Sequence, residues 1–95
     1  MIIYRDAWLE AFYLKSTPHK KIPANITNVL PRKLQLVTAA TCEADLRIPP
    51  RNCFEHLSGK LNDWCSIRVN DQYRLIFKWI VPDAIELYLD KHEYR

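Results

Sequence analysis

The chain has 95 residues, the usual size of one domain, and we expect a single domain over residues 1–95. Hydrophobic residues make up 48% of it, which supplies one core and excludes a disordered tail. The formal net charge of +3 permits a polyanionic partner such as RNA but does not by itself indicate one. No run approaches the roughly 20 apolar residues of a membrane helix, so we expect no membrane association.

The N-terminal 15 residues have acidic side chains within their apolar part and no small-residue cleavage site, which argues against a signal peptide. The three cysteines lack metal-binding spacing and predict reduced, buried thiols in a cytoplasmic protein. Along the chain, residues 2–4 form a short apolar run typical of an edge strand. Asp6 is then placed to cap a helix that begins at Ala7. The apolar stripe of this helix recurs at helical spacing and comprises Trp8, Leu9, Phe12 and Tyr13.

Two prolines and two lysines in residues 16–23 predict a solvated loop. Apolar residues then recur at three- and four-residue steps over 24–41, which favours one helix kinked at Pro31. The alternative is that Asn28 caps a second, shorter helix with Pro31 inside its first turn. Residues 41–52 read as a connector with a short helical turn over 43–46.

From Cys53 onward the hydrophobic period changes from 3.6 to 2, which predicts four strands over 53–57, 64–69, 73–80 and 84–89. Short connections between successive strands predict an antiparallel meander. The expected fold is therefore α+β, with two N-terminal helices packed on a curled antiparallel sheet.

Alternation along these strands separates an apolar face from a basic face. The apolar face should hold Cys65, Ile67, Val69, Tyr73, Leu75, Phe77 and Trp79. The other face should hold Ser66, Arg68, Arg74 and Lys78 around Ile76. In the last strand we expect Ile85, Leu87 and Leu89 on one face, and Glu86, Tyr88 and Asp90 on the other. Such a basic face is common on solvated sheets, but a curled sheet would gather its cations in one concavity.

Titratable groups fall beside this basic face. Asp90, His92 and Tyr94 end the chain, and Glu55 and His56 lie on the first strand of the meander. Glu55 and His56 point to opposite faces of a regular strand, so only one of them can line the site, and the sequence leaves open which. Cations with neighbouring acids and bases suit phosphoryl chemistry on RNA. The chain offers neither a metal-binding motif nor a glycine-rich phosphate loop, so we expect no cofactor.

The stretch "WCSIRVNDQYRLIFKW" (64–79), followed by "DAIELYLDKHEYR" (83–95), resembles the signature of HigB-like toxins of the RelE superfamily, the plasmid maintenance killer proteins. "FEHLSGKLNDW" (54–64) and "YRDAWLEAFY" (4–13) are similar to the loop and first helix of that family. The resemblance implies a RelE-like, microbial ribonuclease-type fold. It also implies the toxin of a type II toxin–antitoxin system that cleaves mRNA at the decoding site of the ribosome without a metal. The implied partners are a helix-turn-helix HigA-like antitoxin, the ribosome with its mRNA, and operator DNA through the antitoxin complex.

By the same resemblance, Arg74 matches the most constant basic residue of the family, and Asp90 and His92 match its terminal acid and histidine. Glu55 stands where some members carry a catalytic histidine, with His56 next to it. The expected catalytic residues are Arg74, His92, Asp90, Glu55 and His56. The expected RNA-binding residues are Arg68, Lys78, Lys60 and Tyr94. Two alternatives stay open: a module that binds RNA or a protein partner without cleavage, and a degenerate toxin that acts only in an operon-regulating complex.

Overall fold

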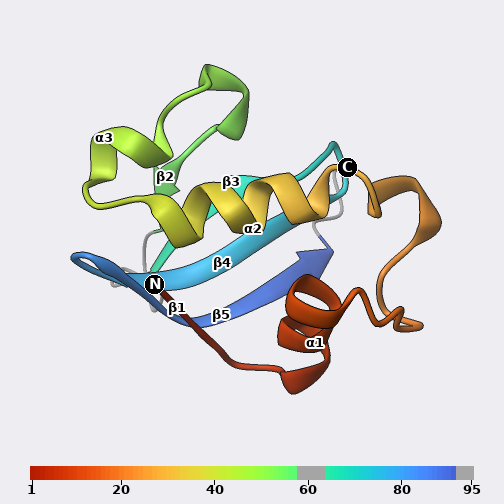
Figure 1. Ribbon diagram of the computed structural model, residues 1–95. Coiled ribbons are helices and arrows are strands. Elements are labelled where there is room, and N and C mark those ends of the chain that lie inside the picture. Colours follow the sequence, from red (N-terminus) through yellow and green to blue (C-terminus); the bar gives the residue numbers. More distant parts are fainter. Residues whose placement is uncertain (58–63, 92–95) are drawn as a thin grey trace.

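The computed structural model describes residues 1–57 and 64–91 and has the expected α+β architecture (Figure 1). Its helical segments are α1 (Ala7–Lys15), η1 (Ala24–Ile26), α2 (Leu30–Ala39), α3 (Glu43–Leu46) and η2 (Pro50–Asn52), where η marks a 3-10 turn. Its strands are β1 (Ile2–Tyr4), β2 (Glu55–His56), β3 (Trp64–Arg68), β4 (Tyr73–Ile80) and β5 (Asp83–Lys91). The predicted edge strand, first helix, connector turn and four-strand meander are thereby confirmed.

The five strands form one sheet in the order β1-β5-β4-β3-β2. Strands β2 to β5 pair antiparallel with their sequence neighbours, as the short connections predicted. Strand β1 pairs parallel with β5, so the sheet is mixed at this edge. Parallel pairing requires a long connection, and here nearly the whole chain lies between the two strands.

The prediction of one kinked helix over 24–41 was wrong. The segment divides into η1 and α2, and Pro31 lies in the first turn of α2. Proline is tolerated there because the first N–H groups of a helix have no partner within the helix. The alternative of two pieces is closer, although Val29 rather than Asn28 occupies the N-cap position. Asp6 does precede α1, but its carboxylate accepts hydrogen bonds from the Arg5 guanidinium instead of capping the helix.

Helices α1 and α2 cover one face of the sheet, and the core lies between the two layers (Figure 1). The two helices contribute Leu9, Phe12, Leu34 and Val37, and the sheet contributes Ile67, Leu75, Phe77 and Leu87. The predicted stripe of α1 is half correct, since Trp8 and Tyr13 only flank this core. Of the cysteines, Cys65 is buried, whereas Cys42 and Cys53 are exposed, contrary to the prediction of three buried thiols. None of the helices described is long and apolar enough to cross a membrane.

A β-bulge at Glu86 changes which side chains of β5 face the core. Ile76 pairs with Tyr88 and Lys78 pairs with Ile85, so Glu86 and Leu87 together stand opposite Phe77. Glu86 has a φ of 55°, the left-handed backbone that a bulge can require. The expectation that Ile85 shares a face with Leu87 and Leu89 was therefore wrong. Ile85 lies on the open face in register with Lys78, and Ala84 is buried instead.

Asn52 is fully buried and ties η2 to the helical layer. Its Nδ2 donates to the carbonyl oxygens of Leu46 and Ile48, both at 3.1 Å, and its Oδ1 accepts from Lys33 Nζ at 2.5 Å. Both polar atoms of the Asn52 side chain therefore have hydrogen-bond partners.

We expect Asn52→Ala to lower the free energy of unfolding by about 1–3 kcal/mol, because its buried partners lose their hydrogen bonds. Urea denaturation monitored by circular dichroism measures the change. Asn28→Ala is the matched control, since Asn28 is exposed and, among the described residues, only its backbone carbonyl accepts a side-chain hydrogen bond. A loss below about 0.5 kcal/mol, the range of ordinary surface substitutions, would contradict this role for Asn52.

Candidate active site

The open face of the sheet carries a row of three charged residues on three neighbouring strands. Arg74 on β4 pairs directly with Arg68 on β3 and with Asp90 on β5. Residues directly opposite across antiparallel strands have Cβ atoms about 4.5–5.5 Å apart. Strand pairing alone therefore brings these three predicted site residues together.

Arg74 is the most firmly held cation of this face. Its Nη1 donates to Glu55 Oε1 and to Ser66 Oγ, each at 2.7 Å, and its side chain is only 12% exposed. Ser66 is buried and pairs with Glu55 across β2 and β3, so both acceptors come from the same register position. A guanidinium has five N–H donors, and contacts with described residues use only one of its nitrogens. Arg74 is fixed in place while other donors stay available to a ligand.

Glu55 and His56 point to opposite faces of the sheet, and this decides which of them lies beside Arg74. The Glu55 carboxylate does. The imidazole of His56 lies on the helix side, with Nε2 2.6 Å from Glu43 Oε1 and Nδ1 3.4 Å from Cys65 Sγ. Hydrogen bonds from Arg47 and His56 lower the pKa of the Glu43 carboxyl. The structure thus joins Glu55, and not His56, to Arg74.

Arg68 and Lys78, the two predicted RNA-binding residues that the structure describes, are already engaged with other groups. Arg68 pairs with the Asp71 carboxylate and its Nε donates to the Asn70 carbonyl at 3.3 Å, so it turns toward the end of the sheet. Lys78 Nζ lies 3.2 Å from Glu86 Oε2 and 5.1 Å from the centre of the Trp64 ring. Lys78 therefore belongs to an aromatic patch and not to the immediate surroundings of Arg74.

Sequence reasoning missed two members of that patch. Trp64 packs edge-on against Tyr88 at 5.9 Å, and the Arg5 guanidinium lies 3.9 Å from the centre of the Tyr88 ring. Burial and the nearby Asp90 raise the pKa of the Tyr88 hydroxyl, and Arg5 opposes this. The alternation of β3 could have placed Trp64 on the open face, but no local pattern pointed to Arg5, which reaches it only because β1 pairs with β5.

Three predicted site residues, His92, Lys60 and Tyr94, lie outside the described residues, and their roles stay predictions. Within 1–57 and 64–91, no group of three or more His, Cys, Asp and Glu residues could hold a metal ion. What the described site offers is a fixed guanidinium flanked by two carboxylates, Glu55 and Asp90. This arrangement can bind a phosphate through Arg74 and accept a proton beside it.

Comparison with known proteins decides the family. The model of the RelE-like toxins of type II toxin–antitoxin system HigB matches residues 3–92. The chain belongs to this HigB-like toxin family. It is 56% identical to Toxin HigB-1 of Vibrio cholerae serotype O1 (strain ATCC 39315 / El Tor Inaba N16961) over 91 residues, which are 96% of each chain. It is also 47% identical to an uncharacterized protein of Haemophilus influenzae (strain ATCC 51907 / DSM 11121 / KW20 / Rd) over 91 residues, 96% of this chain and 90% of that one.

The family predicted from the resemblance of residues 64–79 is thereby confirmed. This HigB-like protein is the toxin of a type II toxin–antitoxin system, and membership of such a system implies an antitoxin partner.

Proposed function

We propose that this HigB-like toxin is an endoribonuclease that cleaves mRNA on the ribosome, without a metal ion, and thereby inhibits translation. One observation supports this above all: the Arg74 guanidinium is held nearly buried at the centre of the open face, between Glu55 and Ser66 and opposite Asp90. Preorganised cations of this kind stabilise the charge that develops during phosphoryl transfer.

The proposed reaction uses the ribose 2′-OH as the nucleophile on its own 3′-phosphate. A base removes the 2′ proton, the new O2′–P bond closes a cyclic phosphate, and the P–O5′ bond breaks as an acid protonates the leaving oxygen. Arg74 would bind the equatorial oxygens of the phosphorane, for which the guanidinium fork is well suited. In the structure, the Glu55 carboxylate forms an ion pair with Arg74. In the proposed reaction, the same carboxylate lies next to the scissile phosphate.

We assign the two proton transfers to Glu55 and His92, and the orientation of His92 to Asp90. Glu55 is supported as the base by its contact with Arg74. Histidine can serve as acid or base near neutral pH because of its ordinary pKa. His92 follows Asp90 by two positions in the sequence. His56 receives no proton-transfer role because its imidazole lies on the other face, against Glu43.

Dependence on the ribosome is expected from the modest charge of the toxin. A protein of net charge +3 should bind free RNA weakly, with an affinity that falls as salt is raised. We expect negligible cleavage of naked mRNA and ready cleavage of the same mRNA on programmed ribosomes, measured by primer extension. Chelation by EDTA, with the magnesium needed by the ribosomes kept in controlled excess, should leave the rate unchanged. Efficient cleavage of naked RNA would refute ribosome dependence, and no cleavage in either state would favour a non-catalytic binding module.

The implied antitoxin is proposed to be a HigA-like protein with a helix-turn-helix, through which the complex binds operator DNA in the cytoplasm. Co-expression with the product of the neighbouring gene tests this proposal. The two proteins should copurify, and the complex, unlike the free toxin, should retard a DNA fragment that carries the promoter.

A further inference from the structure

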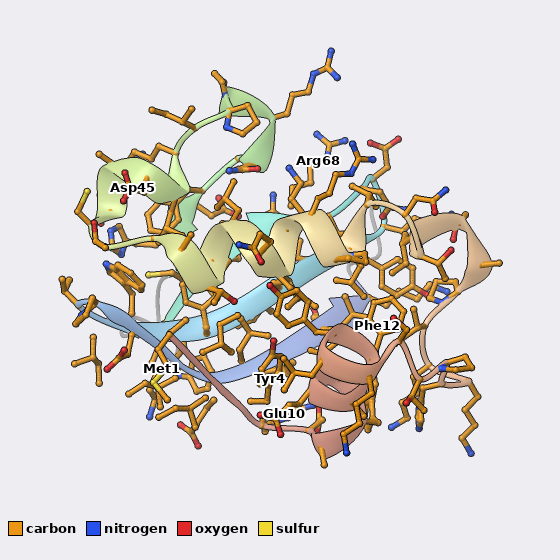
Figure 2. The ribbon with its side chains drawn as sticks, in the orientation of Figure 1. Met1, Tyr4, Glu10, Phe12, Asp45 and Arg68 are labelled. Atoms are coloured by element: carbon orange, nitrogen blue, oxygen red, sulfur yellow. The ribbon has the colours of Figure 1, made fainter. Side chains whose placement is uncertain are left out.

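A second group of cations lies at the end of the sheet, on the helix side and apart from Arg74. A cleft of about 1000 Å³ opens there between the beginning of α2, the turn η2 and the β3–β4 connection. Of the described residues that line it, four from three elements are basic, namely Arg32, Lys33, Arg51 and Arg68, and one is acidic, Asp71. Figure 2 shows Arg68 at this end of the sheet, beside the first turn of α2.

Lys33 is built into this cleft instead of extending freely into solvent. Its Nζ donates at 2.5 Å to Oδ1 of Asn52, whose own side chain is fully buried. Burial, together with the positive charges of Arg32 and Arg51, lowers the pKa of Lys33. A cation placed where its charged form is disfavoured gains from a bound anion.

Carboxylates do not neutralise most of this charge. In the part of the chain that the structure describes, Arg68 is the one cleft cation with an acidic partner, Asp71. Arg32 uses only its Nε, which donates to the Asn28 carbonyl at 3.2 Å, and Arg51 is exposed. The guanidinium ends of Arg32 and Arg51 are thus available for planar, bidentate contacts, the geometry that suits phosphate oxygens.

Arg68 connects the cleft to the candidate active site. Its backbone pairs directly opposite Arg74. Its guanidinium turns the other way, with Nη1 4.0 Å from Cys53 Sγ, the residue that follows η2. An RNA strand bound at Arg74 would therefore be able to continue around the end of the sheet. The cleft lies at the upper end of the roughly 300–1,000 Å³ typical of small-ligand sites, which gives room for more than one phosphate.

We propose that this cleft binds phosphodiester groups of RNA, as a second contact beyond the phosphate at Arg74. The proposal deepens the proposed function and rests on it for the identity of the RNA. The phosphates could belong to the mRNA or to ribosomal RNA, and these two sources share the same chemistry. An acidic partner protein is the competing occupant, and the linkage through Arg68 to Arg74 favours the RNA.

The test measures binding without cleavage. The probe is a single-stranded RNA with 2′-O-methyl riboses, which removes the nucleophile, and the dissociation constant is followed by fluorescence anisotropy across a salt series. The double variant Arg32→Gln/Arg51→Gln is compared with Lys15→Gln/Arg47→Gln, two exposed cations outside the cleft. Both variants remove two positive charges from a chain of net charge +3, so both reach +1. Thermal unfolding confirms that both fold.

The cleft variant should lose about 1.4 from the slope of log K against log salt, since each lost contact to a single strand is worth about 0.7. The control should keep the wild-type slope. Equal slopes for the two variants would overturn the proposal. A cleft variant that keeps the wild-type slope but no longer binds the antitoxin would overturn it as well. Binding to small ribosomal subunits separates the sources: weakening on empty subunits indicates ribosomal RNA, and weakening only with mRNA bound indicates the message. If the cleft variant changes the slope but the wild-type protein cleaves no mRNA, the cleft still binds RNA and the proposed endoribonuclease activity is refuted.

Discussion

Replacing Arg74 by alanine should abolish growth inhibition by the induced toxin and slow single-turnover cleavage of ribosome-bound mRNA by roughly 10²–10³-fold. Removing one preorganised donor from such a site typically raises the barrier by about 2.7–4 kcal/mol. The guanidinium is nearly buried and held at 2.7 Å by both Glu55 and Ser66. Little rearrangement is therefore needed before it can bind a phosphate.

Two further variants show whether geometry or charge is lost. Arg74→Lys keeps the charge but loses the fork, so most of the defect should persist. Arg47→Ala removes an arginine from another Arg–Glu pair, with Glu43 on α3, and should stay toxic. Unfolding curves must accompany the rates, because Arg74→Ala leaves the buried Ser66 hydroxyl without this partner. A folded Arg74→Ala protein with wild-type toxicity would disprove the site assignment.

The second large effect on the cleavage rate should distinguish the roles of two adjacent residues of β2, Glu55 and His56. Glu55→Gln keeps the size of the side chain but removes the base, and should lower the cleavage rate by roughly 10²–10⁴-fold. His56→Gln should stay within a few-fold of wild type, because His56 contacts Glu43 and Cys65 on the opposite face. Single-turnover rates on programmed ribosomes test the pair.

The same assay places the other proton transfer. His92→Ala should lose most of the rate, and Asp90→Asn should lose less if the carboxylate mainly orients its neighbour. An inactive His56→Gln with a fully active Glu55→Gln would reverse the assignment on β2. A His92→Ala rate equal to that of wild type would leave the acid to be sought elsewhere on the open face.

The strands of the meander were predictable because alternation is a local property of the sequence. It placed Arg68 and Arg74 on the open face and Leu75 and Phe77 in the core. The division of residues 24–41 was not predictable, since η1 and α2 present apolar residues at the same three- and four-residue steps that one helix would. Only the position of Pro31 hinted at a break.

The candidate site was predictable in part for a related reason. Strand pairing, which follows from short turns, gave the row from Arg68 to Asp90. The choice between Glu55 and His56 needed the register of β2 against Ser66, and a strand of two residues carries no pattern that sets it. The basic cleft joins α2, η2 and the β3–β4 connection, and long-range packing of this kind leaves no spacing signal in the chain.

The bulge at Glu86 shifts the alternation of side chains between the two faces of the sheet, so that the parts of β5 before and after it alternate out of step. The positions of Ala84 and Asp90 differ by an even number, so the two residues would share a face in a regular strand. Here Ala84 is buried against the helices, while Asp90 stands beside Arg74 on the open side. The extra residue thus uncouples the half of β5 that completes the core from the half that serves the site. Each half can change its side chains under its own constraint, provided that the spacing between them is kept.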